Sequence, residues 1–139
     1  MSGATQQDAL VLLKLSEISA IEGMPLPLAF LSGSEFDRDY AVFRRRNPPG
    51  SEPFDKAMKI VQHMDWLATL WKHHVVDHAL LADWTDVSDM WDRLGGFVRG
   101  VRDELRQQRF GENFETMART EARINALGLG EREVASTAV

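Results

Sequence analysis

Hydrophobic residues recur at alternating spacings of four and three along two long stretches of the chain. This spacing places each series on one face of an α-helix. The first series is Ala57, Val61, Met64, Ala68, Trp71 and Val75, and the second is Val87, Trp91, Leu94, Val98, Val101 and Leu105. The pattern therefore predicts two long core helices, at about residues 53–74 and 85–108, that pack along each other as in a helical bundle.

Shorter apolar patterns predict further helices on both sides of this pair. Residues 6–22 are expected to form a mostly buried first helix, with an apolar face of Val11, Leu12, Leu15, Ile18 and Ile21 that Leu10 and Leu13 widen. A helix is expected to start at Ser34 and run through the segment FDRDYAVFRRR, up to the breaker cluster at 47–50. Asn113 is expected to cap a last helix.

The fold class that these elements predict is all-α. No strand-like alternation of polar and apolar residues persists for more than a few positions. We expect a single-domain bundle of about five to six helices over residues 1–127. Residues 128–139, GLGEREVASTAV, lack an apolar period and are expected to form a disordered C-terminal tail.

Composition narrows the classes of function. The chain has no cysteine, which excludes disulfides, thiolate zinc sites and cysteine nucleophiles. No apolar run approaches the roughly 20 residues of a membrane span, and the start lacks the basic region of a signal peptide. The net charge of −5 opposes general attraction to nucleic acid. We therefore expect a soluble cytoplasmic protein that does not associate with membranes and has no cofactor.

The densest group of candidate ligands is KHHVVDHALL, residues 72–81, which holds three of the four histidines. On a continuous helix, His74 and His78 would lie one turn apart, and so would His73 and Asp77. Such an arrangement can bind zinc. The sequence favours a break instead, because Asp77 before an apolar run is typical of an N-cap. We expect a corner between two helices, with histidines that point apart and bind no metal.

Other polar residues suggest binding but no catalysis. Trp66 and Trp84 lie beside the apolar faces of their helices, and exposed tryptophan favours a protein interface. Arg44, Arg45 and Arg46 form the only basic run, which makes them a weak RNA-binding candidate. No Walker loop, nucleophile elbow or metalloprotease motif occurs, so no catalytic residue is expected.

Two segments resemble a bacterial family of small helical proteins of unknown function. DALVLLKLSEI, from Asp8, is similar to that family's Asp-Ala-x-x-x-Leu-Lys-Leu opening, and RFGENFETMA, from Arg109, is similar to its Tyr/Phe-x-Glu-Asn-Phe-Glu close. The resemblance places residues 72–81 at an interhelical corner, where the family often has a glycine at the position of His74. It implies a cap and core-anchor role for Asn113, Phe114 and Glu115, and no activity.

Three functions stay open at this stage. The first is a non-enzymatic protein-interaction or regulatory module that binds a protein partner or forms a homodimer. The alternative is a metal-dependent enzyme that uses His73, His74, Asp77 and His78. The third is a weak RNA binder that uses Arg44 to Arg46.

Overall fold

The structure is a computed structural model that describes the backbone of residues 4–21 and 27–137; side chains at 15, 18–21, 27 and 129–137 lie outside the description. Over these ranges the chain is all-α, as the sequence predicts, and has no strand. The same ranges contain seven helices in place of the five to six expected. The helices are α1 (Gln6–Ile21), α2 (Pro27–Ser32), α3 (Tyr40–Arg46), α4 (Glu52–Lys72), α5 (His78–Trp84), α6 (Val87–Glu104) and α7 (Glu112–Thr137).

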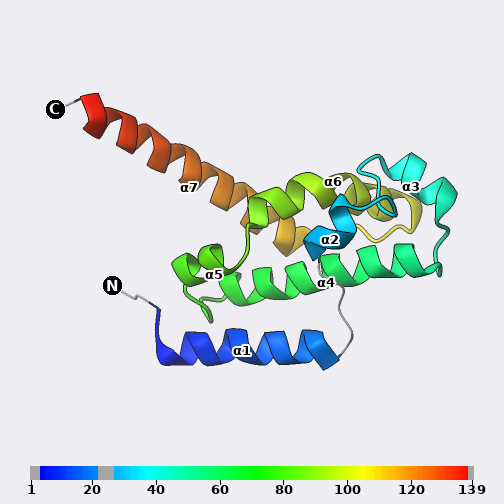
Figure 1. Cartoon of the computed structure of the whole chain (residues 1–139), viewed down its shortest axis with the longest axis horizontal. Helices are drawn as coiled ribbons and strands as arrows, with labels where there is room; N and C mark the ends of the chain where they lie inside the picture. Colours follow the sequence, from blue (N-terminus) through cyan, green and yellow to red (C-terminus); the bar gives the residue numbers. More distant parts are fainter. Residues whose placement is uncertain (1–3, 22–26, 138–139) are drawn as a thin grey trace.

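Helices α4, α6 and α7 pack on one another and form the centre of the molecule (Figure 1). Both predicted apolar series lie at this centre, and their inner members are 2% exposed or less: Ala57, Val61, Met64, Ala68, Val87, Leu94, Val98 and Val101. The outer members Val75 and Leu105 are 45% and 36% exposed because α4 already ends at Lys72 and α6 at Glu104. The two long core helices are thus confirmed: their C-terminal ends lie two and four residues before those expected, and their starts lie within two residues of those expected.

A cluster of phenylalanines joins α3 to the centre. Phe97 on α6 makes edge-to-face contacts with Phe43 and Phe54, at ring-centroid distances of 5.8 and 5.3 Å. Two α6 glycines permit this approach: a Cβ at Gly96 would lie 2.7 Å from the carbonyl oxygen of Arg38, and one at Gly100 would overlap the ring of Tyr40. The lack of side chains at these positions therefore lets α3 lie close to α6.

The expected helix from Ser34 is wrong, because α3 begins only at Tyr40. Asp39 is its N-cap, and its carboxylate accepts hydrogen bonds from the backbone N–H groups of Ala41 and Val42. Asp37 in turn accepts the N–H of Asp39, which holds the chain in a turn before the helix. The sequence pattern placed the start too early because Phe36 is buried without being helical.

Helix α1 lies along the outside of the molecule beside α4 (Figure 1). Its start carries a capping box in which Thr5 and Asp8 exchange hydrogen bonds. Leu12 is buried, but Leu10 and Leu13 are 64% and 60% exposed. The expectation of a mostly buried helix is therefore wrong for these two leucines, because no described element covers that side of α1.

The C-terminal helix extends further than expected. The backbone of α7 is helical to Thr137, within the segment 128–139 for which the sequence predicts a disordered tail. Because side chains from 129 onward lie outside the description, the tail and the domain end at residue 127 stay predictions. Among the described helices, none is both long and apolar enough to cross a lipid bilayer.

Candidate functional site

The histidine segment forms a corner, as the sequence predicts. Helix α4 ends at Lys72 with His73 as its C-cap, and His74 adopts a left-handed conformation with φ of 59°. The N–H of His74 bonds to the carbonyl of Trp71 at 3.1 Å, and that of Val75 to the carbonyl of Leu70 at 2.9 Å. This pair of hydrogen bonds is the Schellman motif, a common end of helices that usually has glycine where His74 stands.

Asp77 is the N-cap of α5, because its carboxylate accepts the N–H of Leu80 at 3.2 Å. The histidines do not all point apart, however, and this expectation is wrong for one pair. The rings of His74 and His78 stack with centroids 6.1 Å apart, and His78 also lies 5.1 Å from the ring of Trp71. The left-handed turn at His74, just after α4, brings its ring to that of His78, the first residue of α5.

This ring pair does not by itself make a metal centre. Two parallel imidazole rings present their faces to each other, whereas metal ligands direct nitrogen lone pairs at one point. Asp77 already uses its carboxylate as a helix cap, and His73 is exposed. Among the residues that the structure describes, no three His, Asp or Glu side chains are arranged to hold a metal ion.

The closing motif at the start of α7 is a structural junction. Phe114 is 0% exposed and meets Trp91 edge to face at 5.2 Å. Glu115 forms an ion pair with Arg102 of α6 at 2.7 Å, and the Nε of Arg102 donates to the carbonyl of Phe110 at 2.8 Å. These contacts give Phe114 the core-anchor role and make Glu115 a link between α6 and α7.

Asn113 does not cap α7, in contrast to the expectation from sequence. The helix begins at Glu112 after Gly111, and Asn113 already lies inside it. Its amide nitrogen donates to the Thr69 hydroxyl at 3.2 Å, and its amide oxygen accepts from Lys72 at 3.4 Å. Asn113 therefore ties α7 to the last turns of α4.

The cap of α7 comes from Asp65 on α4, a residue that the sequence reasoning missed. Its Oδ1 accepts the backbone N–H groups of Asn113 and Phe114, both at 3.0 Å. Gly111 precedes the helix with φ of 68°, and a Cβ there would lie 3.1 Å from Val98. The residue before α7 is thus a glycine, which has no side chain to cap the helix. This glycine was the one signal in the sequence that the cap comes from elsewhere.

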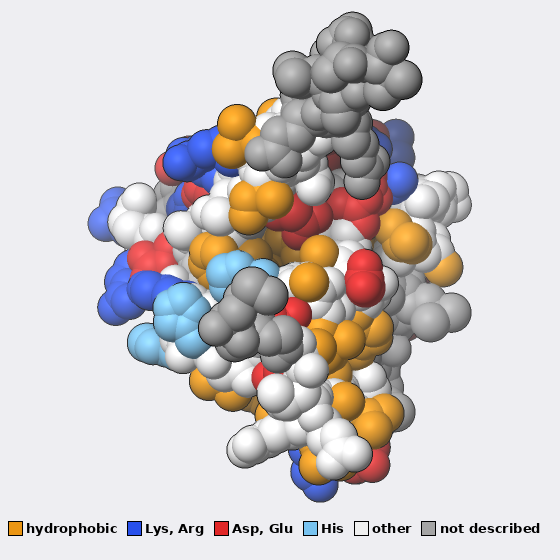
Figure 2. Space-filling model, turned by 90° about the vertical axis from the view of Figure 1, so that its left-hand side faces the viewer, with side chains coloured by type: hydrophobic (Ala, Val, Ile, Leu, Met, Phe, Trp, Pro, Cys, Tyr) orange, Lys and Arg blue, Asp and Glu red, His pale blue; other side chains and the backbone are white. Residues whose placement is uncertain are grey.

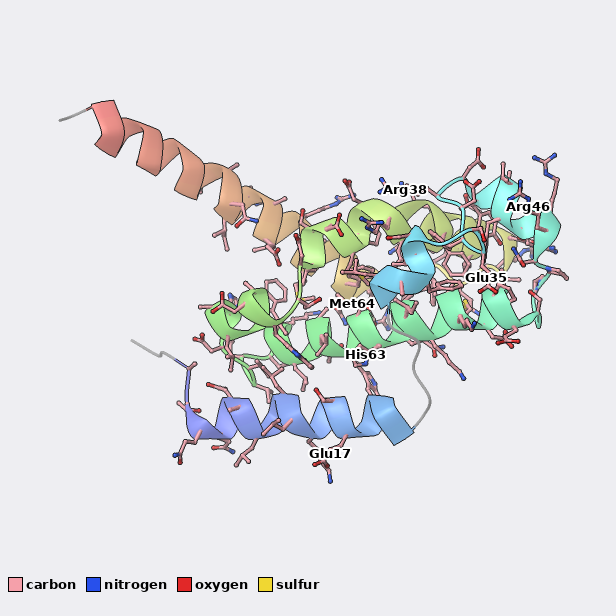
Figure 3. The ribbon with its side chains drawn as sticks, viewed as in Figure 1. Glu17, Glu35, Arg38, Arg46, His63 and Met64 are labelled. Atoms are coloured by element: carbon pink, nitrogen blue, oxygen red, sulfur yellow. The ribbon has the colours of Figure 1, made fainter. Side chains whose placement is uncertain are left out.

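The basic run on α3 is divided among different contacts. The Nε of Arg44 pairs with Glu104 at 2.8 Å, and the Nε of Arg45 donates to the carbonyl of Ala41 at 3.3 Å. Arg46 is exposed at the outer end of α3 (Figure 3). One of the three charges is therefore neutralised within the fold, which weakens this run as a site for nucleic acid.

Tyr40 completes the contact at Glu104. Its hydroxyl donates a short hydrogen bond to Glu104, which also accepts from Arg44. Burial, and then this hydrogen bond, raise the pKa of Tyr40 to about 12. The same hydrogen bond is the main cause that lowers the pKa of Glu104. The three side chains join α3 to the last turn of α6.

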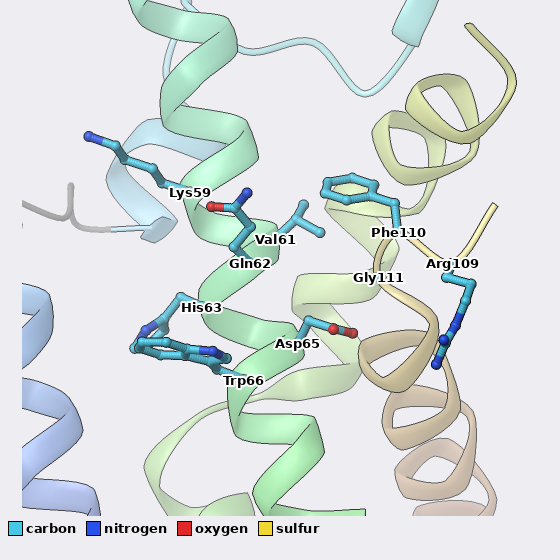
Figure 4. Close-up of a pocket in the computed structure, with 9 residues that line it drawn as sticks. All are labelled: Lys59, Val61, Gln62, His63, Asp65, Trp66, Arg109, Phe110 and Gly111. Carbon is cyan, nitrogen blue, oxygen red and sulfur yellow. The ribbon is translucent and has the colours of Figure 1, made fainter. Parts of the chain in front are cut away.

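Both candidate tryptophans are exposed, Trp66 at 54% and Trp84 at 41%. Trp66 lies beside His63 on the side of α4 that faces α1 (Figure 4). Trp84 lines a groove of about 430 Å³ together with Leu28 of α2, which is itself 54% exposed. Large apolar side chains therefore reach the surface on α1, α2, α4 and α5.

A second groove, of about 390 Å³, follows α4 next to the start of α7. Figure 4 shows that its lining divides into two groups: Trp66 and His63 extend to one side of α4, whereas Asp65 and Phe110 lie on the other. Asp65 is held by its capping hydrogen bonds. These residues do not converge on one point, so the groove has no arrangement of acid, base and nucleophile.

Comparison with known proteins gives a family but no activity. Residues 4–120 match the family model described as Domain of unknown function (DUF4760). No curated protein and no solved structure shows significant similarity to the chain. The match covers most of the chain, from the capping box before α1 to the Glu-Asn-Phe-Glu motif that opens α7. The chain therefore belongs to the DUF4760 family.

Proposed function

We propose that the protein is a non-enzymatic, cytoplasmic protein-interaction module that binds its partner through the outer face of α1. The exposure of Leu10 and Leu13, at 64% and 60%, carries the proposal, because a different side of the same helix already buries Leu12. A helix that is apolar on two sides is typical of one enclosed by protein. Burial of each leucine contributes about 1.5–3 kcal/mol at most, which favours an interface over permanent exposure.

The exposed tryptophans support this proposal. Tryptophan is enriched at protein interfaces, where its large ring contributes area at a small loss of side-chain entropy. Trp66 lies on the side of α4 toward α1 (Figure 4), next to the helix that carries the proposed interface. Its 54% exposure leaves apolar surface that an interface would cover.

The partner that fits this surface most simply is a second copy of the chain. In a twofold dimer the same surface faces itself, so its charges must be self-complementary. Lys14 and Glu17 carry opposite charges on α1, and their side chains are 73% and 67% exposed. Two α1 helices related by a twofold axis would bury the leucines and exchange these ion pairs.

Sedimentation equilibrium tests the proposal. We expect the wild-type chain to dimerise in a concentration-dependent way, and the double variant Leu10→Glu, Leu13→Glu to be monomeric with unchanged helix content. Leu127→Glu is the matched control, because Leu127 is 68% exposed on α7 and should leave dimerisation unchanged. A wild-type chain that stays monomeric at all concentrations, or a double variant that dimerises as strongly as wild type, contradicts the proposal.

A metal-dependent activity at the corner is the second candidate, because the rings of His74 and His78 lie 6.1 Å apart. It requires a ring rotation that turns both imidazoles toward one ion, with His73 or Asp77 as a further ligand. Protein purified without a histidine tag would then contain stoichiometric zinc or manganese. If such protein is metal-free and zinc leaves its melting temperature unchanged, this candidate is excluded.

A further inference from the structure

A pocket of about 260 Å³ lies between α5 and α7, where α4 ends. Its α5 wall contains Ala79 and Ala82, and its α7 wall contains Ile124. The pocket exists because the alanine methyl groups are too short to fill the space between the two helices. The buried side chains of Leu81 and Met117 form part of the lining. The walls therefore suit an aliphatic group.

One end of the pocket is aromatic. Trp71, which is half-buried, and His78 both line it, with ring centroids 5.1 Å apart and ring planes 32° from parallel. The face of an indole ring attracts cations, and this attraction increases when the cation is removed from water. Figure 2 shows histidine, hydrophobic and acidic side chains gathered on this face of the molecule.

The pocket also contains a single carboxylate, that of Glu121. Burial, together with the negative charge of Asp86, raises its pKa, while a hydrogen bond from the backbone N–H of Ser88 acts in the opposite direction. Within the described part of the chain, neither Lys nor Arg pairs with Glu121. Arg119, on the same helix, pairs with Glu115 instead. Glu121 therefore has no Lys or Arg partner among the residues that the structure describes.

We propose that this pocket binds a small organic ammonium ion. The ammonium group lies toward Glu121 and the ring of Trp71, and the alkyl part packs against Ala79, Ala82 and Ile124. A metal ion fits less well, because calcium and magnesium require several oxygen ligands and most of this lining is apolar. The volume of about 260 Å³ lies below the range of drug-sized pockets, which limits the ligand to a few carbon atoms.

This site is separate from the α1 surface and does not depend on dimerisation. Calorimetric titration of the full chain with n-butylammonium chloride, at constant ionic strength, tests it. We expect saturable binding, with shifts of the Ala79 and Ala82 methyl resonances in NMR spectra. n-Butanol, which has the same alkyl chain without the charge, should bind at least about tenfold more weakly, since loss of a charged contact is of that order.

Two variants separate the contributions to binding. Glu121→Gln removes the charge and should weaken n-butylammonium binding by about tenfold or more. Ala82→Leu places a larger side chain in the pocket from an exposed position and should abolish binding without unfolding the chain. Asp103→Asn, an exposed acid at the opposite end of α6, is the control for the loss of one charge and should bind as wild type.

Three results would overturn the inference. The first is absence of saturable binding to the wild-type chain. The second is equal affinity of wild type and Glu121→Gln, with both folded as judged by circular dichroism. The third is equal affinity for n-butanol, which would leave an apolar pocket without selectivity for a cation.

Discussion

Asp65, in the middle of α4, accepts the backbone N–H of Phe114 at 3.0 Å, and thereby caps a helix 49 residues further along the chain. The same Oδ1 accepts the N–H of Asn113. The first N–H groups of a helix have no partner within the helix, and a carboxylate there also interacts favourably with the positive end of the helix dipole. One side chain therefore stabilises both the start of α7 and its packing on α4.

Replacement of Asp65 by Ala should lower the free energy of unfolding by about 1–3 kcal/mol, because two partly buried N–H groups lose their acceptor. Asp65→Asn keeps an acceptor oxygen and should be less destabilising. Urea denaturation followed by circular dichroism measures both. Asp92→Ala, an exposed acid on α6, should change stability by less than about 0.5 kcal/mol. Equal urea midpoints for Asp65→Ala and wild type would show that the cap is not important for stability.

The glycines of α6 give a second prediction. Alanine normally stabilises a helix by about 1 kcal/mol relative to glycine. At Gly100 the added methyl group would overlap the Tyr40 ring, so Gly100→Ala should instead destabilise the protein by about 1–3 kcal/mol through overpacking. Gly128→Ala on α7 is the control, because a Cβ there meets no atom within 4 Å. Equal melting temperatures for Gly100→Ala and Gly128→Ala would contradict the close approach of α3 and α6.

The sequence predicted those parts of the fold that depend on local periodicity. The apolar spacing around Val61 and Val98 located the two core helices, because burial of one helix face leaves a regular pattern. Asp77 was identified as a cap because capping acts over three residues. Such local signals need no knowledge of which helices become neighbours.

The predictions that failed concern features that depend on contacts between residues far apart in the sequence. Leu10 and Leu13 have the same apolar character as Leu12, and only the arrangement of the other helices decides which side of α1 is covered. The cap at Asp65 joins residues that are 48 and 49 positions apart. The pairing of the histidine rings depends on one left-handed residue, His74, that reverses the direction of the chain. Periodicity carries no information on these three features.

The left-handed residue at the corner gives a third prediction. His74 has φ of 59°, a conformation in which a side chain is strained and glycine is not. His74→Gly should therefore raise the free energy of unfolding by about 0.5–1 kcal/mol, even though the ring contact with His78 is lost. The effect is measured as an increase in melting temperature.

His73→Gly is the control for His74→Gly, because it makes the same substitution at the preceding residue. His73 has φ of −93°, so glycine relieves no strain there and adds freedom to the unfolded chain. We expect this variant to be equal to wild type or less stable. A lower melting temperature for His74→Gly than for His73→Gly would indicate that the ring stack outweighs the backbone strain.

The last prediction uses Tyr40, the only tyrosine of the chain, so tyrosinate absorbance reports on this residue alone. The pKa of Tyr40 is raised from 10.0 to about 12, chiefly by burial and then by its hydrogen bond to Glu104. Spectrophotometric titration should give a midpoint near 12 for the folded chain and near 10 for the chain unfolded in urea. In this interval the unfolded state binds fewer protons, so stability should fall as the pH rises from 10 to about 12.

Glu104→Gln separates the two causes of this shift. The variant removes the negative charge beside Tyr40, and the positive charge of Arg44 then acts on the hydroxyl without opposition. The folded midpoint should therefore fall below that of wild type but stay above 10, because burial is the larger cause. Glu17→Gln, an exposed acid on α1, should leave the midpoint unchanged. If Glu104→Gln titrates as wild type, the hydrogen bond between α3 and α6 does not control this pKa, and burial alone holds the proton on Tyr40.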